Sequence, residues 1–244
     1  MKNDGREKRN MPDGPLILGW DTSTENGALF LGVPGVLLEE KNFHTEKGHT
    51  SWLMPLIDSM LKRAQVDPWC VDAIAVGIGP GNFTGLKVGV STAKAVAMAL
   101  DVPLVALPTL DAVAVTASRD ARLVVSVIDA KRGLSYAAVY RPEGGWPKRV
   151  SGYMCLGPEG IARAVMAAPG YNCDERGPQR GLVIAGDPPA RLGGLLEADG
   201  ARPVYSGGTF PGGREFLELS HRIMLEDGAG TAVSVTPMYL KKPV

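Results

Sequence analysis

The spacing of apolar residues predicts three short strands at the start of the chain. Apolar residues dominate residues 16–20, 27–33 and 36–38, and only short polar or glycine-containing turns separate these runs. Strands that are joined by such short turns pair with antiparallel neighbours. We therefore predict an antiparallel three-stranded meander.

Helical and strand patterns alternate in the segments that follow. Apolar residues recur at helical spacing over residues 51–63, and residues 73–76 and 103–107 are short apolar runs typical of buried strands. Between these two strands, a glycine-rich loop leads into a predicted helix over residues 84–100. The first half of the chain therefore predicts a mixed α/β sheet.

The predicted helix over residues 84–100 has one face that is nearly bare of side chains. Its small residues fall at successive i, i+4 positions: Gly85, Gly89, Ala93 and Ala97. Glycine inside a helix costs up to about 1 kcal/mol relative to alanine, so a close approach by another segment must offset that cost. That segment can belong to the core of the same chain or to a partner, and the sequence leaves both open.

The glycine-rich loop does not match a known nucleotide-binding motif. A P-loop ends in Gly-Lys-Ser or Gly-Lys-Thr, but Leu86 separates Gly85 from Lys87 and no hydroxyl follows the lysine. A dinucleotide fingerprint also fails, because Asn82 or Thr84 occupies its third glycine position.

Four stretches of sequence carry a resemblance to one protein family. Residues 79–89 read Gly-Pro-Gly-Asn-Phe-Thr-Gly-Leu-Lys-Val-Gly, and residues 21–24, 128–133 and 237–241 follow the same family pattern in order. These stretches resemble TsaB, the bacterial subunit formerly called YeaZ. The resemblance implies a role in the pathway that makes threonylcarbamoyladenosine in tRNA.

The second half of the chain repeats the pattern of the first. An apolar run over residues 123–128 ends in Asp129, passes Gly133 and resumes over residues 135–140. With the resemblance, this repeat predicts the duplicated, ribonuclease-H-like α/β fold of actin, Hsp70 and sugar kinases, in two lobes. The second lobe is predicted to be reduced, with helices near 158–168 and 214–226 and a strand over 182–185. We expect a disordered tail over 1–14, a first lobe with the interface helices over 15–117 and a second lobe over 118–244.

Composition argues against several classes of function. The 244 residues include 26 Lys plus Arg and 26 Asp plus Glu, so no overall basic field favours direct binding of nucleic acid. Three cysteines without a Cys-x-x-Cys pair fit a reducing compartment. The chain has no apolar run near 18 residues and no signal-peptide pattern, so we expect a cytoplasmic protein without a membrane partner.

Nucleotide-using members of the resembled fold carry an aspartate for metal and hydroxyl groups for phosphate in the first hairpin. Residues 21–24 match this pattern in part, but Glu25 places a negative charge where phosphate would require a positive one. We therefore favour a structural turn for Asp21 and its neighbours. Neither Gly186-Asp187 nor Gly207-Gly208 makes a persuasive adenosine turn. No cofactor is predicted for the chain alone, and ATP or ADP is expected only at the level of a complex.

A metal centre and catalysis by the chain itself are not predicted. The catalytic relative of TsaB, called TsaD, has a His-x-x-x-His pair after the strand that corresponds to residues 104–107, and this chain has Thr109 and Val113 there. The three histidines, His44, His49 and His221, share no helix face that would form a ligand pair. We predict no metal ligand and no catalytic residue.

Two functions from different classes remain. The resemblance implies a non-catalytic partner that binds and activates TsaD in a heterodimer, for transfer of a threonylcarbamoyl group to N6 of the adenosine next to the anticodon in tRNAs that read ANN codons. It also implies TsaE in the complex, only indirect contact with tRNA, and a possible homodimer. The alternative is an independent ATP-binding phosphotransferase of the same fold.

The predicted partner interface combines the helices over residues 51–63 and 84–100, which should lie side by side on one face of the first sheet. Its candidate residues are His49, Trp52, Leu53, Leu56, Met60, Thr84, Lys87, Val88, Ser91, Lys94, Ala95 and Met98.

Overall fold

A computed structural model describes residues 12–44, 52–119, 121–171, 181–206, 210–226 and 228–240. By their contacts, the residues form two compact units. Unit 1 comprises residues 1–78, 84–107 and 212–237, and unit 2 comprises residues 79–83, 108–211 and 238–244. Nearly all of the tail predicted over residues 1–14 lies outside the described residues.

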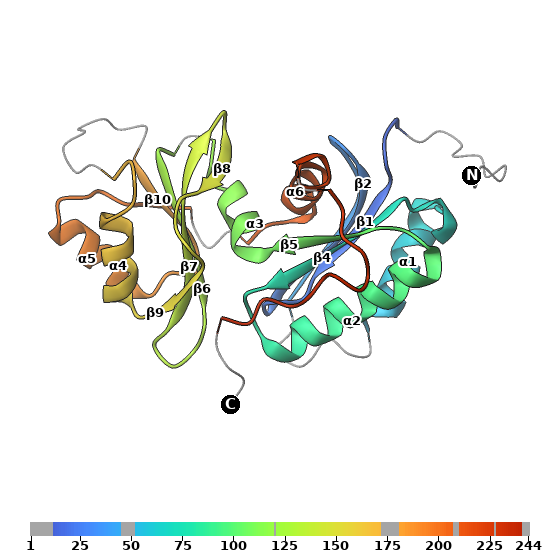
Figure 1. The fold of residues 1–244 in the computed structure, drawn as a ribbon, viewed down its shortest axis with the longest axis horizontal. Coiled ribbons are helices and arrows are strands. Elements are labelled where there is room, and N and C mark those ends of the chain that lie inside the picture. The colour runs from blue at the N-terminus through green and yellow to red at the C-terminus, as the bar shows by residue number, and fades with distance from the viewer. Residues whose placement is uncertain are drawn as a thin grey trace. The chain divides into compact units, whose positions relative to one another are not determined.

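Unit 1 is built on a five-stranded sheet with the strand order β3-β2-β1-β4-β5 (Figure 1). Its strands are β1 (Ile17–Asp21), β2 (Asn26–Val33), β3 (Val36–His44), β4 (Ala73–Gly79) and β5 (Leu104–Pro108). The first three strands are antiparallel, and β4 is parallel to β1. The predicted meander is confirmed, although β3 continues beyond residue 38, because the polar positions of this edge strand do not show the apolar pattern.

Helices cover both faces of the unit 1 sheet. Figure 1 shows α1 (Leu53–Ala64) and α2 (Phe83–Leu100) on one face and α6 (Gly213–Glu226) on the other. Side chains alternate between the faces of a strand, so Trp20 of β1 shares a core cluster with α1 and α2. On the opposite face, Phe30 of β2 stacks on Phe216 of α6, with the ring centroids 6.1 Å apart. A short 3-10 helix, η1 (Pro68–Cys70), connects α1 to β4.

Unit 2 contains a six-stranded sheet with the main order β11-β10-β6-β7-β8, and β9 pairs with β7. Its strands are β6 (Leu123–Asp129), β7 (Ser135–Glu143), β8 (Trp146–Arg149), β9 (Met154–Leu156), β10 (Leu182–Gly186) and β11 (Val204–Tyr205). Two helices, α4 (Pro158–Met166) and α5 (Ala190–Ala198), share a core cluster with one face of β6. The helix α3 (Thr109–Val115) packs on the other face.

The two sheets are copies of one design. In both, three antiparallel strands in sequence are followed by a parallel fourth and a fifth, in the spatial order third, second, first, fourth, fifth. In the first copy a helix follows the third, fourth and fifth strands; in the second copy helices follow the fourth and fifth strands, and β9 lies between the third strand and α4. The predicted duplicated actin-like, ribonuclease-H-like fold is confirmed. The strands that correspond to β3 and β5 are shorter in the second copy, with four residues in β8 and two in β11.

The last helix of each copy packs in the unit built on the other copy. The helix α3 follows β5 in the sequence but packs on β6, β7, β8 and β10, while α6 follows β11 and packs on β1, β2 and β3. The boundary predicted between residues 117 and 118 lies in the segment between α3 and β6. The compact units differ from this division because they exchange these two helices.

Candidate functional site

The row of small residues on α2 faces the sheet of its own unit. Gly85, Gly89, Ala93 and Ala97 are all buried. Trp20 Nε1 donates a hydrogen bond to the Gly89 carbonyl at 3.1 Å, and Thr22 Oγ1 donates to the Gly85 carbonyl at 2.8 Å. A Cβ atom at Gly89 would collide with Thr22 Oγ1. Of the two alternatives that the sequence left open, the row therefore takes the first and packs in the core of its own chain.

A different stripe of α2 is open to solvent. Thr84, Lys87, Ser91, Ala95 and Met98 are exposed and recur every three or four residues, so they share one side of the helix. The Met98 side chain is 69% exposed. We call these five residues the α2 stripe. Two further candidates, Val88 and Lys94, are partly buried beside it.

The candidates on α1 divide between the core and the surface. Leu53 and Met60 are buried in the core of unit 1, so they support the helix and cannot contact a partner as predicted. Leu56 is partly buried. Sequence reasoning missed Met54, which is 51% exposed in the first turn of α1.

Trp52 and His49 precede α1 in the sequence. Trp52 is partly buried and packs edge-on against Phe43, with the ring centroids 4.6 Å apart. This contact leaves part of its surface for a partner. His49 lies outside the described residues.

The first hairpin is held by its own side chains. Asp21 is 2% exposed, and its Oδ1 accepts a hydrogen bond from the Ser23 backbone N–H at 2.6 Å. A Cβ atom at Gly77 would collide with the Asp21 carboxyl group, so glycine permits the close approach of β4. In the second copy, Asp129 Oδ1 accepts from the Lys131 N–H at 2.8 Å in the same way. Asp21 and Asp129 therefore each form the expected side-chain turn. Whether a nucleotide binds at the hairpin stays a prediction.

Comparison with known proteins identifies the family. A sequence model described as "TsaD: tRNA N6-adenosine threonylcarbamoyltransferase" matches residues 38–165, which is more than half of the chain. The chain belongs to the TsaD/TsaB family. The matched region includes α1, α2 and α3.

Individual relatives refine the resemblance. The chain is 31% identical over 134 residues to "tRNA threonylcarbamoyladenosine biosynthesis protein TsaB" of Bacillus subtilis, covering 55% of this chain and 58% of the relative. It is 33% identical over 130 residues to the protein of the same name from Escherichia coli, covering 51% and 54%. The chain thus spans just over half the length of these curated relatives. A solved structure, "YeaZ from Pseudomonas aeruginosa", superposes with a TM-score of 0.75 at 27% identity over 93% of this chain and 100% of that one.

Thr109 and Val113, which the resemblance places where TsaD has a histidine pair, lie on α3. Thr109 is 2% exposed, and Val113 is fully buried in the core of unit 2. A valine side chain has no metal-ligating atom, so these residues do not fit a metal pair of the TsaD type. Among the described residues, no group of three or more His, Cys, Asp or Glu side chains is arranged to hold a metal ion.

The same helix carries a polar cluster that sequence reasoning missed. The Tyr140 hydroxyl donates to Asp111 Oδ1 at 2.6 Å, and the Tyr153 hydroxyl lies 2.9 Å from both carboxylate oxygens. Burial raises the pKa of Asp111, while the two tyrosine hydrogen bonds and the charge of Arg149 lower it. Burial also raises the pKa values of Tyr140 and Tyr153. The cluster fixes α3 to β7 and to the segment before β9.

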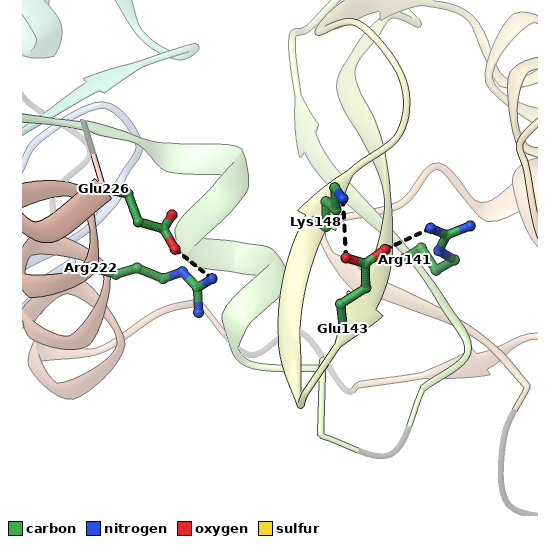
Figure 2. A network of polar contacts seen from close by, with 5 residues as sticks. All are labelled: Arg141, Glu143, Lys148, Arg222 and Glu226. Atoms are coloured by element: carbon green, nitrogen blue, oxygen red, sulfur yellow. Dashed lines mark hydrogen bonds and ion pairs between the residues drawn. The ribbon is translucent and has the colours of Figure 1, made fainter.

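Two sets of exposed ion pairs are surface features (Figure 2). In unit 2, Arg141 and Lys148 lie 2.6 and 3.1 Å from the carboxylate of Glu143, and their hydrogen bonds lower the pKa of that group. In unit 1, Arg222 and Glu226 pair at 2.6 Å within α6. Exposed pairs of this kind contribute little to stability. They give no indication of a binding site.

Of the two glycine turns considered for adenosine, only Gly186-Asp187 lies within the described residues. Gly186 has a φ of 92°, and the N–H of Asp187 donates to the Val127 carbonyl at 2.8 Å, so this segment is a structural turn after β10. Gly207 and Gly208 lie outside the described residues.

A search for membrane-spanning segments among the described helices finds no candidate.

Proposed function

We propose that this chain is a non-catalytic subunit that binds TsaD and is required for transfer of the threonylcarbamoyl group to N6 of adenosine in tRNA. Relatives named as threonylcarbamoyladenosine biosynthesis proteins support a role in this pathway. The observation that carries the partner role is the α2 stripe, in which Met98 lies exposed beside polar and basic side chains. Contiguous exposed apolar patches with a polar rim mark protein interaction sites, and Ala95 and Met98 are the apolar members of this stripe.

The absence of catalysis by the chain itself is part of the proposal. The hairpin residues that would bind a metal and phosphate in an ATP-using relative are engaged in holding β1 to α2 and β4. The positions of the TsaD histidine pair are occupied by a threonine and a valine. These observations favour a partner over an independent phosphotransferase.

The test is a reaction reconstituted from TsaD, TsaE, tRNA, ATP and the adenylated threonylcarbamoyl donor, with and without this chain. Turnover should be lost when the chain is left out. Full activity of TsaD and TsaE without the chain would refute the role.

A matched pair of variants tests whether the α2 stripe binds TsaD. Met98→Arg should weaken TsaD binding by roughly tenfold or more, because it places a charge in an apolar contact. Leu225→Arg is the control, since Leu225 is 73% exposed on α6, at the opposite face of the unit 1 sheet. Both variants should keep the wild-type melting temperature. If both variants bind TsaD with the same affinity, the α2 stripe is not part of the interface.

The alternative enzyme has a direct test of its own. The isolated chain should bind ATP weakly or not at all, with or without Mg²⁺, by isothermal titration calorimetry. Tight, Mg²⁺-dependent binding would favour the phosphotransferase and place a nucleotide in the chain itself, not only in the complex.

A further inference from the structure

The two compact units carry net charges of opposite sign. The described part of unit 1 contains seven Lys and Arg residues and twelve Asp and Glu residues, whereas that of unit 2 contains ten Lys and Arg residues and seven Asp and Glu residues. The balance of 26 and 26 over the whole chain therefore hides a positively charged unit 2.

The cations of unit 2 gather at one end of its sheet. The parallel strands β6, β10 and β11 begin at this end, and the hairpin between β7 and β8 lies there as well. Six of the ten cations lie on or next to these strand ends: Arg119, Arg122, Arg141, Lys148, Arg149 and Arg202. The described acidic residues on the same segments are Glu143 and Asp199. We call the six cations the basic end of unit 2.

The register of the sheet sets four of the six in a row across the strands. Arg122 and Arg202 flank Gly181, whose carbonyl accepts the Arg122 N–H at 3.2 Å. On the other side of β6, Arg141 of β7 is the cross-strand partner of Lys148 of β8. Neighbouring strands lie about 4.8 Å apart, so the row from β11 to β8 extends over roughly 20 Å.

The hairpin between β7 and β8 ends this row in an open tip. Gly144 and Gly145 have φ values of 61° and 79°, and a Cβ atom added to either would meet no heavy atom within 4 Å beyond its chain neighbours. Such glycines let another backbone approach closely. Figure 2 shows Glu143 between Arg141 and Lys148. These ion pairs alone indicate no site, but the three residues together keep one net positive charge beside the tip.

Arg149 is held in a fixed orientation next to this row. Its guanidinium carbon lies 4.0 Å from the centroid of the Tyr153 ring, and its Nη1 donates to the Ser151 carbonyl at 2.9 Å. An arginine fork that is already oriented loses less conformational entropy when it binds a phosphate.

The exposed groups at this end favour a polyanion over a protein face or a lipid surface. The exposed residues of the segment 141–149 are four charged residues and two glycines, while Trp146 and Pro147 are partly buried. Protein docking sites have an apolar centre, and membrane-binding surfaces bury apolar side chains. Contacts from Lys and Arg to the phosphates of a nucleic acid need neither.

We propose that the basic end of unit 2 binds the sugar-phosphate backbone of RNA and contacts the tRNA directly while TsaD modifies it. This inference rests on the proposed function for the identity of the RNA as tRNA and for the role of TsaD. Phosphate contacts position a nucleic acid without reading its bases, so the contact is independent of sequence.

Two triple variants of equal net charge separate the basic end from the overall charge of the chain. The basic-end variant removes three exposed cations of the basic end: Arg119→Gln/Lys148→Gln/Arg202→Gln. The control variant removes three exposed cations from the β6–β7 turn, α4 and α5: Arg132→Gln/Arg163→Gln/Arg191→Gln. Both should keep the wild-type melting temperature, because all six side chains are exposed.

The first experiment needs no TsaD and measures binding of the isolated chain to a fluorescently labelled, unmodified tRNA transcript by anisotropy at low salt. Wild type should bind with a Kd of roughly 10–100 µM, as sequence-independent contacts do, and an unrelated RNA of equal length should bind alike. The basic-end variant should bind at least about tenfold more weakly, and its plot of log K against log salt should be shallower by about 2–3. The control variant should bind like wild type. No binding by wild type at about 300 µM, or equal losses in both variants, would overturn the inference.

The second experiment compares complexes of TsaD with wild type and with each variant. The basic-end variant should bind TsaD as wild type does, while its complex should hold the tRNA transcript at least about tenfold more weakly. If this variant instead loses TsaD binding, or loses binding to phosphatidylserine vesicles but not to RNA, the surface serves a protein or a membrane and the inference fails. If TsaD neither binds nor needs the chain, the proposed function fails, and the RNA contact is still decided by the first experiment.

Discussion

Asp21, Thr22 and Ser23 are residue types that could bind a metal and phosphate, yet each is fully or almost fully buried in unit 1. Asp21 accepts the Ser23 N–H, and Thr22 donates to a carbonyl of α2. The sequence showed the carboxyl and hydroxyl groups, and Glu25 argued against phosphate. It could not show that Thr22 reaches Gly85, because this hydrogen bond joins residues that are far apart in the chain.

Asp111 gives a pH-dependent prediction. Burial raises its folded-state pKa above the ordinary value near 3.8, so the folded state binds the proton more tightly than the unfolded chain does. Its contribution to stability is therefore fully present below pH 3.8 and is lost as the pH rises through the folded-state pKa. Asp111→Asn removes this titration. We expect the free energy of unfolding of wild type, relative to Asp111→Asn, to decrease over this window and then level off.

Urea denaturation at a series of pH values between 3 and 8 measures this difference. Tyr140→Phe removes a hydrogen bond that stabilises the ionised carboxylate, so the folded-state pKa should rise and the window should extend to higher pH. Parallel stability profiles for wild type and Asp111→Asn would show that the Asp111 pKa is not raised in the folded protein.

Helices and strands with a clear pattern of apolar residues were predicted from the sequence, and most of the short helices and strands were not. The strands β1, β2, β4, β5, β6, β7 and β10 and the helices α1, α2, α4 and α6 follow apolar runs or helical spacing in the sequence. The helix α3 was missed because it has only seven residues and five of them are buried, so no polar face marks it. The three residues of β9 and the two of β11 are defined by pairing to β7 and β10, which no local pattern reveals.

The exposure of the candidate interface residues follows less directly from the sequence than the fold does. The helical spacing correctly placed Lys87, Ser91 and Met98 on one side of α2. It did not show whether the row of small residues or the α2 stripe faces the sheet. Trp20 and Thr22 determine which side of α2 faces the sheet, because their side chains contact the row of small residues. Whether a partner covers the stripe stays a prediction.

Substitutions at two glycines test the packing of α2 against its sheet. Gly89→Ala should destabilise the protein by about 1–3 kcal/mol, because the new Cβ meets Thr22 Oγ1 in a packed core. Gly194→Ala on α5 is the matched control, since its added Cβ meets no heavy atom within 4 Å beyond its chain neighbours and the backbone of its own helix. It should stabilise the protein by up to about 1 kcal/mol through helix propensity.

Chemical denaturation of the two variants measures both effects. Adding Thr22→Ala should make Gly89→Ala less costly than it is in the wild-type background, because the colliding hydroxyl is gone. Stabilisation by Gly89→Ala would mean that α2 does not lie against Thr22.

On the scale of the whole molecule, the exchange of α3 and α6 makes the two copies depend on each other. Unit 1 needs Phe216 and Leu217 of α6, each 2% exposed, to cover the face of its sheet around Phe30. The N–H of Gly213 also donates to Glu40 of β3 at 3.1 Å. Sequence repeats identify the copies but do not show which sheet each final helix covers, because either sheet has an apolar face for it.

Cutting the chain between residues 117 and 118 tests this dependence. The fragment over residues 12–117 lacks α6 and leaves Phe30 uncovered, so it should be unfolded or aggregated alone and should gain structure when the fragment over residues 118–244 is added, by circular dichroism. Phe216→Ala in the second fragment should weaken this recovery, since loss of a buried phenylalanine typically costs about 3–5 kcal/mol. Leu225→Ala, at an exposed position of the same helix, is the control and should leave recovery intact. Cooperative unfolding of the first fragment by itself would show that unit 1 is complete without α6.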